Sequence, residues 1–296
     1  MSYRLIDGRK LSAQTLSELA LGISDIKVKT GLSPGLSLIS VGDDPASNIY
    51  VRTKERTAAS VGIFAKAHRL PFKSTAMEVK TLIENLNSDP RCHGIVVQLP
   101  LPEHIDVGTV LRSIDPFKDV DGLHPFNVGL LASGHPRFIP ATPGGIRQML
   151  LRTNNMPSGK HVVIVGRSNI VGRPLSQLLS ARIEGGNATV TLCHSHTLEL
   201  SSICRLADII IVAVGVPNFL TGDMVSDGVV AIDVGINRVN TPVSRRGYKL
   251  VGDIDFSTVS KKASAISKVP GGVGPMTVAM LLSNTLEAAR MSYQGV

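Results

Sequence analysis

The sequence is poor in aromatic residues and in cysteine. It has no Trp, four Tyr and seven Phe among 296 residues, too few for the row of stacked aromatics that binds single-stranded nucleic acid. Its three cysteines are too few and too scattered for a disulfide framework or a zinc knuckle. We therefore expect a reducing compartment and no metal centre.

Long apolar runs are also missing. The first residues contain no apolar segment of the kind that marks a secretory signal. The longest apolar stretches fall short of the about 20 residues that a membrane helix needs. We expect a cytoplasmic protein that does not interact with membranes.

Charge is scarce but biased towards positive. Charged residues make up 18% of the chain and apolar residues 43%, a balance that excludes intrinsic disorder. Lys and Arg number 31 against 23 Asp and Glu, which leaves a net charge of +8. This excess is compatible with nucleic-acid binding, with a site for an acidic small molecule, or with a merely basic surface. Because the basic residues are spread along the chain, nucleic acid is disfavoured.

Short β-branched runs alternate with amphipathic stretches along the chain. The runs predict buried strands at residues 36–41, 94–98, 161–165, 188–192, 208–214 and 229–234. The stretches predict helices over residues 11–26, 79–86, 146–152 and 276–290. Such alternation is typical of the α/β class with parallel sheets. Three prolines and three glycines in residues 133–145 predict a linker between two domains.

One predicted strand runs into a glycine turn and a helix start. The segment Gly166-Arg-Ser-Asn-Ile-Val-Gly172 follows the strand at 161–165, and such a turn offers backbone N–H groups to a phosphate. The glycine spacing departs from the usual G-x-G-x-x-G, so a purely structural turn is the alternative.

The end of the next predicted strand bears on the choice of cofactor. It reads Cys193-His-Ser-His-Thr197 and lacks the acid that binds the ribose 2′-hydroxyl in NAD-binding folds. Arg167, Ser195 and the two histidines suit a 2′-phosphate, which favours NADP over NAD. His194 and His196 as metal ligands are the alternative, but no third ligand is spaced nearby.

Tyr50 and Lys54 lie four residues apart in a predicted helix, so they share one face. Ser47 is the expected N-cap of that helix. The pair suits general acid–base work, although spacing alone favours a surface lysine that packs past a tyrosine.

Three further polar or glycine-rich segments follow predicted strands or lie in loops. Gln98 ends a strand, where parallel sheets bind ligands. Asp119 and Asp121 suit a donor-rich heterocycle, a base or a metal, with an Asx turn before Gly122 as the alternative. The loop at 270–275 lacks the Lys-[Ser/Thr] of a triphosphate-binding loop. It suits a flat ligand or is a flexible connector.

Taken together and in this order, the motifs resemble those of the methylenetetrahydrofolate dehydrogenase/cyclohydrolase family. They are Tyr50-x-x-x-Lys54, Val97-Gln-Leu-Pro100, Asp119-Val-Asp-Gly122, Pro140-x-Thr-Pro143, Gly166-Arg-Ser-x-x-Val-Gly-x-Pro174, Asp233-Val-Gly-Ile-Asn237 and Pro270-Gly-Gly-Val-Gly-Pro-Met-Thr277. The resemblance spans nearly the whole chain. Ala141 departs from the family's usual Cys, and His124-Pro-Phe replaces the small polar residues often found there.

The resemblance implies two reactions. 5,10-Methylenetetrahydrofolate gives a hydride to NADP, and water then opens the resulting methenyl cation to 10-formyltetrahydrofolate. Lys54 would be the key catalytic residue, hydrogen-bonded to Gln98, with Tyr50 stacked on the aminobenzoate ring and Asp121 on the pterin.

The resemblance also implies the remaining contacts and the architecture. Folate would contact Tyr50, Lys54, Val97, Gln98, Leu99, Pro100, Asp121, Pro270, Gly271, Gly272, Val273 and Gly274. NADP would contact Gly166, Arg167, Ser168, Ser195 and Ile236. We expect a catalytic domain of residues 1–143 plus 275–296, a Rossmann-like NADP domain of residues 144–274, a cleft between them, and a homodimer.

Overall fold

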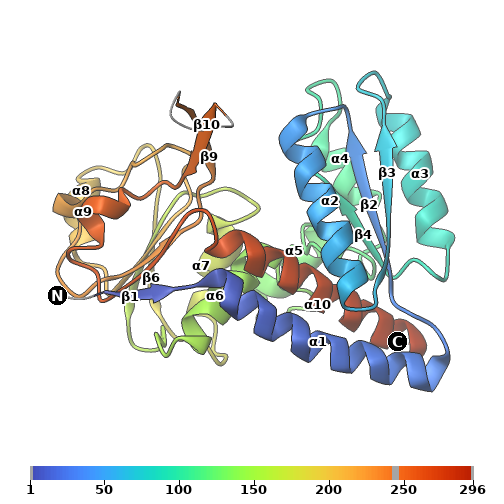
Figure 1. Ribbon diagram of the computed structural model, residues 1–296, viewed down its shortest axis with the longest axis horizontal. Helices are drawn as coiled ribbons and strands as arrows, with labels where there is room; N and C mark the ends of the chain where they lie inside the picture. Colours follow the sequence, from blue (N-terminus) through green and yellow to red (C-terminus); the bar gives the residue numbers. More distant parts are fainter. Residues whose placement is uncertain (1–2, 242–246, 295–296) are drawn as a thin grey trace. The chain divides into compact units, whose positions relative to one another are not determined.

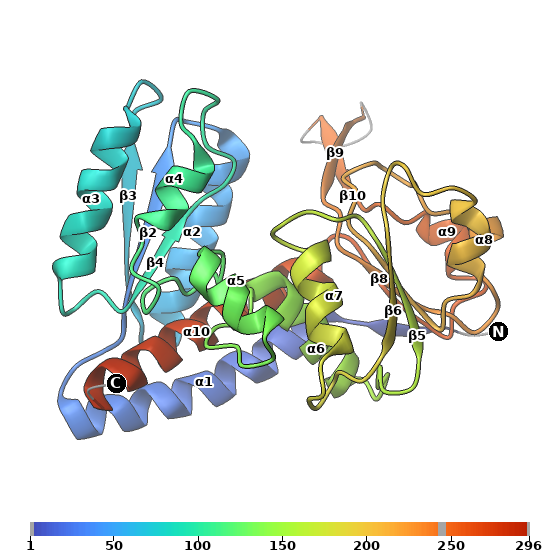
Figure 2. The ribbon, with the colours of Figure 1, turned by 180° about the vertical axis from the view of Figure 1, so that it is seen from behind.

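The computed structural model describes residues 3–241 and 247–294, and their contacts divide the chain into two α/β units. The six-stranded unit comprises residues up to Ser12 together with Thr142–Thr277. The three-stranded unit comprises Ala13–Ala141 together with residues from Val278 onward. Figures 1 and 2 show the two units from opposite sides.

The three-stranded unit has a parallel sheet in the order β3-β2-β4. Its strands are β2 (Gly35–Val41), β3 (Phe64–Leu70) and β4 (Gly94–Val97). Its helices are most of α1 (Gly8–Thr30), α2 (Pro45–Ser60), α3 (Ala76–Ser88), α4 (Val107–Arg112), α5 (Pro125–Ala132) and most of α10 (Val273–Gln294).

Apolar side chains of β2 and β4 point to both faces of this sheet, and helices cover both faces. Leu36, Leu38 and Val96 pack with α1, α2 and α10 on one face. Ile39 and Ile95 pack with α3 and α4 on the other face. In both views α2 and α3 flank the sheet from opposite sides. A capping box of Thr75 and Glu78 begins α3.

The six-stranded unit has an all-parallel sheet in the order β1-β11-β8-β7-β5-β6. Its strands are β1 (Arg4–Ile6), β5 (His161–Val165), β6 (Thr189–Cys193), β7 (Ile209–Val212), β8 (Val230–Asp233) and β11 (Ala265–Ser267). A separate antiparallel hairpin is formed by β9 (Asn237–Asn240) and β10 (Tyr248–Val251). The helical elements are α6 (Ala141–Arg152), α7 (Gly172–Ser180), α8 (Leu200–Arg205), α9 (Phe256–Val259) and the 3₁₀ turn Gly222–Met224.

This sheet is also covered on both faces. Helices α6 and α7 pack on the face that carries Val162, Ile164 and Ile211. Helices α8 and α9 pack on the face that carries Val163 and Ile210. Since β6 and β7 lie on opposite sides of β5, the strand order reverses at β5, and ligands of α/β sheets bind at such switch points.

The α/β class and the six predicted strands are confirmed, whereas five strands were not predicted from the sequence. β1, β11 and the hairpin strands have only three or four residues each. β3 reads Phe-Ala-Lys-Ala-His-Arg-Leu, with polar residues among the apolar ones, and lies at the edge of its sheet. Short or half-exposed strands carry little hydrophobic periodicity.

The contact division differs from the expected domain limits at the N-terminus. β1 pairs with β11, so residues up to Ser12 belong with Thr142–Thr277 and not with the segment that follows them. The other limits fall at 141/142 and 277/278, and the stretch expected to be a linker is already helical from Ala141. Pairing of strands far apart in sequence leaves no local signal in the first residues.

The expected N-cap of α2 was wrong. Asp44 caps the helix, because its Oδ2 accepts a hydrogen bond from the backbone N–H of Ser47 at 2.7 Å. Ser47 therefore lies in the first turn of α2. Among the described residues, no helix is both long and apolar enough to cross a membrane.

Candidate active site

Lys54 and Gln98 meet at the carboxyl end of the three-stranded sheet. Lys54 Nζ donates a hydrogen bond to Gln98 Oε1 at 3.1 Å. The residue after β4, Gln98, is held by its backbone N–H, which donates to the carbonyl of Ile39 at 2.8 Å. Its side-chain Nε2 donates to the Leu99 carbonyl at 2.9 Å. These bonds orient the amide so that its oxygen faces the lysine.

Asp121 lies close enough to Lys54 for the charge of each to act on the other. Burial lowers the pKa of Lys54, and the negative charge of Asp121 opposes that shift. Burial raises the pKa of Asp121, and the positive charge of Lys54 opposes that shift. A lysine whose pKa is lowered in this way can act as the neutral amine, and therefore as a proton acceptor.

Tyr50 lies one turn before Lys54 in α2 and is 37% exposed. Burial of its phenol raises the pKa of Tyr50, so the side chain is a neutral ring with a hydroxyl group. An exposed ring beside the lysine is available for stacking on a flat ligand.

Asp119 has a structural role distinct from that of Asp121. It is 1% exposed, and its oxygens accept hydrogen bonds from the N–H groups of Leu123 and His124 and from Asn127 Nδ2. Burial raises the pKa of Asp119 to about 7. Asp119 therefore fixes the loop between α4 and α5, and of the two aspartates only Asp121 acts on the charge of Lys54.

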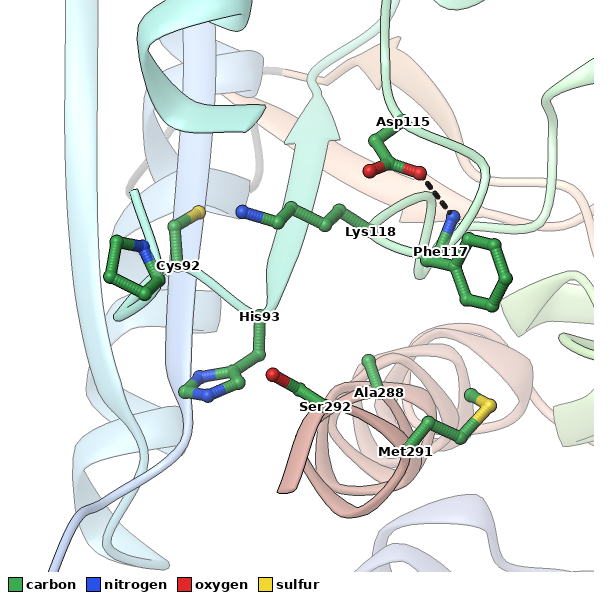
Figure 3. A pocket seen from close by; sticks show the side chains of 9 residues that line it. Cys92, His93, Asp115, Phe117, Lys118, Ala288, Met291 and Ser292 are labelled. Carbon is green, nitrogen blue, oxygen red and sulfur yellow. Dashed lines mark hydrogen bonds between the residues drawn. The ribbon is translucent and has the colours of Figure 1, made fainter. Parts of the chain in front are cut away.

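A cavity of about 300 Å³ lies at the opposite end of β4 from Gln98 (Figure 3). Cys92 and His93, which precede β4, line it, as does Lys118. Lys118 Nζ donates hydrogen bonds to the carbonyls of residues 86, 87 and 89, at the end of α3. This cavity is therefore separate from the Lys54 site.

The glycine turn of the six-stranded unit is built for close backbone approach. Gly166 has a φ of +116°, and a Cβ there would lie 2.2 Å from the carbonyl oxygen of Ala213. A Cβ at Gly172 would lie 1.8 Å from the carbonyl oxygen of Gly166. Helix α7 begins at Gly172 without a side-chain cap, and Ser168 Oγ accepts from the N–H of Val171 at 3.2 Å. The hydroxyl proton of Ser168 remains available to an anion.

The end of β6 places polar groups near this turn. The N–H of Gly166 donates to the Cys193 carbonyl at 2.9 Å, so the glycine turn lies beside the β6 end. Burial and the positive charges of Arg167 and His196 lower the pKa of His194. Arg167 and Ser195 are exposed. Among the described residues, no cluster of three or more His, Cys, Asp or Glu could hold a metal ion.

The loop at 270–274 belongs to the six-stranded unit, and residues near the N-terminus hold it. The N–H of Arg9 donates to the Gly271 carbonyl at 3.2 Å, and Ser12 Oγ donates to the Pro275 carbonyl at 3.0 Å. A Cβ at Gly8 would lie 1.8 Å from the carbonyl oxygen of Gly272. Of the five loop residues, Pro270 is exposed, Gly274 is half-buried and the rest are buried. The sequence contained no signal for this role of residues 8–12.

The predicted residues therefore form separate groups within each unit. Tyr50, Gln98 and Asp121 gather around Lys54 in the three-stranded unit, and the strand end at Val97–Pro100 carries Gln98. The predicted NADP residues lie in the six-stranded unit, at the ends of β5, β6 and β8.

Comparison with known proteins identifies the family. The catalytic-domain model of tetrahydrofolate dehydrogenase/cyclohydrolase matches residues 6–121, and the NAD(P)-binding-domain model matches residues 140–293. The chain belongs to the tetrahydrofolate dehydrogenase/cyclohydrolase family. The family expected from the motifs, with its two enzymatic activities, is thereby confirmed.

Relatives within this family match over the full chain. The bifunctional protein FolD of Moorella thermoacetica is 50% identical, covering 98% of this chain and 100% of the relative. The crystal structure of the Campylobacter jejuni FolD dehydrogenase/cyclohydrolase is 47% identical, covers 98% of this chain and 99% of that one, and has a TM-score of 0.91. The FolD of Trypanosoma brucei, complexed with NADP cofactor and an inhibitor, is 38% identical, covers 99% of both chains and has a TM-score of 0.94.

Proposed function

We propose that the two activities of this enzyme use different residues, with proton transfer at Lys54 in the three-stranded unit and NADP binding in the six-stranded unit. The hydrogen bond between Lys54 Nζ and Gln98 Oε1 carries the proposal, and the charge of Asp121 acts on the same lysine. In this assignment the three-stranded unit is the folate-binding catalytic domain. The roles of the two domains, folate chemistry in one and NADP binding in the other, are part of this proposal.

Hydrolysis of the methenyl cation requires proton handling, and the fraction of Lys54 in the amine form supplies it. As the water oxygen bonds to the bridging carbon, one proton passes from the water to Lys54 Nζ. When the bond from that carbon to the ring nitrogen breaks, the nitrogen takes this proton back from Lys54. The hydroxyl proton of the adduct leaves to solvent as the formyl group forms, so one proton is released overall.

The other residues orient the folate around this lysine. Asp121 accepts hydrogen bonds from the donor-rich edge of the pterin, and Tyr50 stacks on the aminobenzoate ring. Gln98 holds Lys54 in place. Further folate contacts are assigned to Val97, Leu99, Pro100, Pro270, Gly271, Gly272, Val273 and Gly274.

Oxidation places a different demand on the chain. A folate nitrogen lone pair assists departure of the hydride, so this step needs alignment and no strong base. When bound, NADP supplies the hydride acceptor. The residues at its site fit a dinucleotide, because Gly166 leaves no room for a side chain and the start of α7 has no side-chain cap.

The choice of NADP over NAD rests on the end of β6. Arg167, Ser195 and the two histidines at 194 and 196 suit a 2′-phosphate, and residues 194–197 include no acid for a ribose hydroxyl. Ile236, 44% exposed after β8, adds an apolar contact.

An assay of the wild-type protein tests this function. We expect loss of methenyltetrahydrofolate faster than the spontaneous rate with no cofactor present, and oxidation of methylenetetrahydrofolate that is faster with NADP than with NAD. A protein that oxidises methylenetetrahydrofolate but does not accelerate the hydrolysis would contradict the role of Lys54.

We further propose a cytoplasmic homodimer that binds neither nucleic acid nor membranes. Three unpaired, buried cysteines suit a reducing compartment, and the family resemblance supports the dimer. Light scattering tests the dimer, cell fractionation tests the compartment, and duplex DNA at low salt tests nucleic-acid binding.

A further inference from the structure

Two buried aspartates join the strand ends of the six-stranded unit. Asp233 ends β8 and is 4% exposed, and Asp253 follows β10 and is 0% exposed. Buried carboxylates need several hydrogen-bond donors to compensate for lost hydration. Their donors come from three segments of this unit, residues 214–215, 235–237 and 253–254.

Asp253 uses both carboxylate oxygens. Its Oδ2 accepts hydrogen bonds from the backbone N–H groups of Val214 at 2.7 Å and Gly215 at 2.9 Å, just after β7. Its Oδ1 accepts from Asn237 Nδ2 at 2.8 Å, at the start of β9. One side chain thus ties the end of β7 to the segment that carries Ile236.

Asp233 also holds the segment that carries Ile236, and it binds the backbone of Asp253 and of the residue after it. Its Oδ1 accepts from the N–H groups of Gly235 at 3.2 Å and Asp253 at 2.9 Å, and its Oδ2 accepts from the N–H of Ile254 at 3.0 Å. A Cβ at Gly235 would lie 2.0 Å from Asp253 Oδ1. The segments pass so close that only glycine fits there.

The segment held by Asp253 also contacts the glycine turn. The carbonyl of Ala213, one residue before Val214, is the group that a Cβ at Gly166 would strike. β7 and β8 lie on the side of β5 away from β6. In a dinucleotide bound at this switch point, the loops after β7 and β8 face the nicotinamide half, and the β6 end faces the adenosine half.

We propose that Asp253 and Asn237 are positioning residues for the dehydrogenase step, because they hold the loops after β7 and β8 that orient the nicotinamide. The inference rests on the proposed NADP site. Neither side chain touches a reacting atom in this assignment; both act through the backbone at 214–215 and through the segment around Ile236.

Asn237→Asp is the variant that breaks this link with the least change of shape. It places a second carboxylate next to Asp253 Oδ1, in place of the Asn237 Nδ2 group that donates a hydrogen bond to that oxygen. Asn237→Asp/Asp253→Asn reverses the pair. The amide introduced at position 253 can keep its oxygen towards the N–H groups of Val214 and Gly215 and donate from its nitrogen to the carboxylate introduced at position 237. Asn240→Asp makes the same chemical change at an exposed position of β9 and serves as the matched control.

We expect Asn237→Asp to lower the dehydrogenase kcat and to weaken NADP binding by about ten-fold each, a change in free energy comparable to the loss of one hydrogen bond to a charged group. The adenosine fragment 2′,5′-ADP, which lacks nicotinamide, should bind within about two-fold of wild type, as measured by calorimetry. Cyclohydrolase activity without cofactor should be unchanged. The reversed pair should recover most of the dehydrogenase kcat, and Asn240→Asp should behave as wild type.

Equal loss of 2′,5′-ADP and NADP binding in Asn237→Asp, parallel loss of both activities, or no recovery in the reversed pair would overturn the positioning role. Wild-type protein in the same assays separates this outcome from failure of the proposed function. If wild type itself shows no preference for NADP over NAD, the proposed cofactor site is wrong. If wild type prefers NADP but Asn237→Asp and Asn240→Asp have the same dehydrogenase kcat and NADP affinity, only the positioning role is wrong.

Discussion

The Lys54 site and the glycine turn at Gly166 use different parts of the polypeptide. Around Lys54, titratable side chains lie close enough to shift one another's pKa, and one side-chain hydrogen bond orients the lysine. Around Gly166, the backbone is close-packed and side chains are absent where contact is tightest. Proton transfer needs groups that can change charge, whereas hydride transfer needs alignment, and the two sites differ accordingly.

Of the substitutions that test this difference between the two sites, we expect the one at Lys54 to have the largest effect on activity. Lys54→Met removes the amine that takes the proton from water, so cyclohydrolase activity should fall by about 10²–10⁴-fold. NADP binding, measured by calorimetry, should be unchanged because the NADP residues lie in the other unit.

Lys29→Met, at an exposed position in the last turn of α1, is the control for Lys54→Met and should leave both activities at wild-type level. Hydrolysis of methenyltetrahydrofolate at the wild-type rate by Lys54→Met would remove Lys54 from the mechanism.

A substitution in the glycine turn should have the converse effect, weaker NADP binding with cyclohydrolase activity retained. Gly166→Ala puts a methyl group 2.2 Å from the Ala213 carbonyl oxygen at a φ of +116°, so NADP binding should weaken by about ten-fold or more and stability should fall by about 1–3 kcal/mol. Cyclohydrolase activity without cofactor should persist.

Gly228→Ala has a similarly positive φ of +87° but no atom near the added methyl group, so it separates backbone strain from the contact at Gly166. If both variants lose NADP binding equally, the close approach at Gly166 is not what the cofactor requires. Thermal unfolding and NADP titration measure the two effects.

A smaller effect is expected at Arg167. Arg167→Ala removes a cation from the proposed 2′-phosphate site, and we expect the KM for NADP to rise by about ten-fold, the size of a charged hydrogen bond. The KM for NAD should not change. Arg173→Ala, whose side chain donates to Asn169 Oδ1, is the exposed control. An unaltered NADP/NAD ratio in Arg167→Ala would exclude this residue as the 2′-phosphate partner.

The smallest effect is a displaced pH profile. Cyclohydrolase kcat should rise with pH as Lys54 loses its proton, with an inflection below the ordinary lysine value because burial lowers the pKa of Lys54. Asp121 stabilises the ammonium form, so Asp121→Asn should move the inflection to still lower pH while raising the KM for folate. An inflection that moves to higher pH in Asp121→Asn would contradict the pairing of Asp121 with Lys54.

Much of the fold was predictable because its central strands are buried on both faces. β5 and β7 are mostly β-branched, β2 and β8 are buried along their whole length, and the first helix has a recognisable pattern. β3 was missed because one of its edges and part of its surface face solvent, which permits polar residues. The N-cap of α2 was misplaced because both Asp44 and Ser47 are capping residue types.

Residue spacing predicted the candidate site only as separate motifs, and the family resemblance alone implied the hydrogen bond between Lys54 and Gln98. Nothing in the spacing of Lys54, Gln98 and Asp121 states that they meet, and Asp119 has the same residue type as Asp121 but a structural role. Asp253 had no sequence signal, since its donors come from residues 214, 215 and 237.

The amino-acid sequence by itself determined the α/β class, the order of most elements and, through its motifs, the family, because these depend on local periodicity and on residue types at short spacing. Only the tertiary structure decided that β1 joins the six-stranded sheet, that the charge of Asp121 acts on Lys54 while Asp119 holds a loop, and that Asp253 ties two strand ends together. The physical reason is that burial and long-range hydrogen bonding set the charge state and orientation of a side chain, and both arise from segments far apart along the chain.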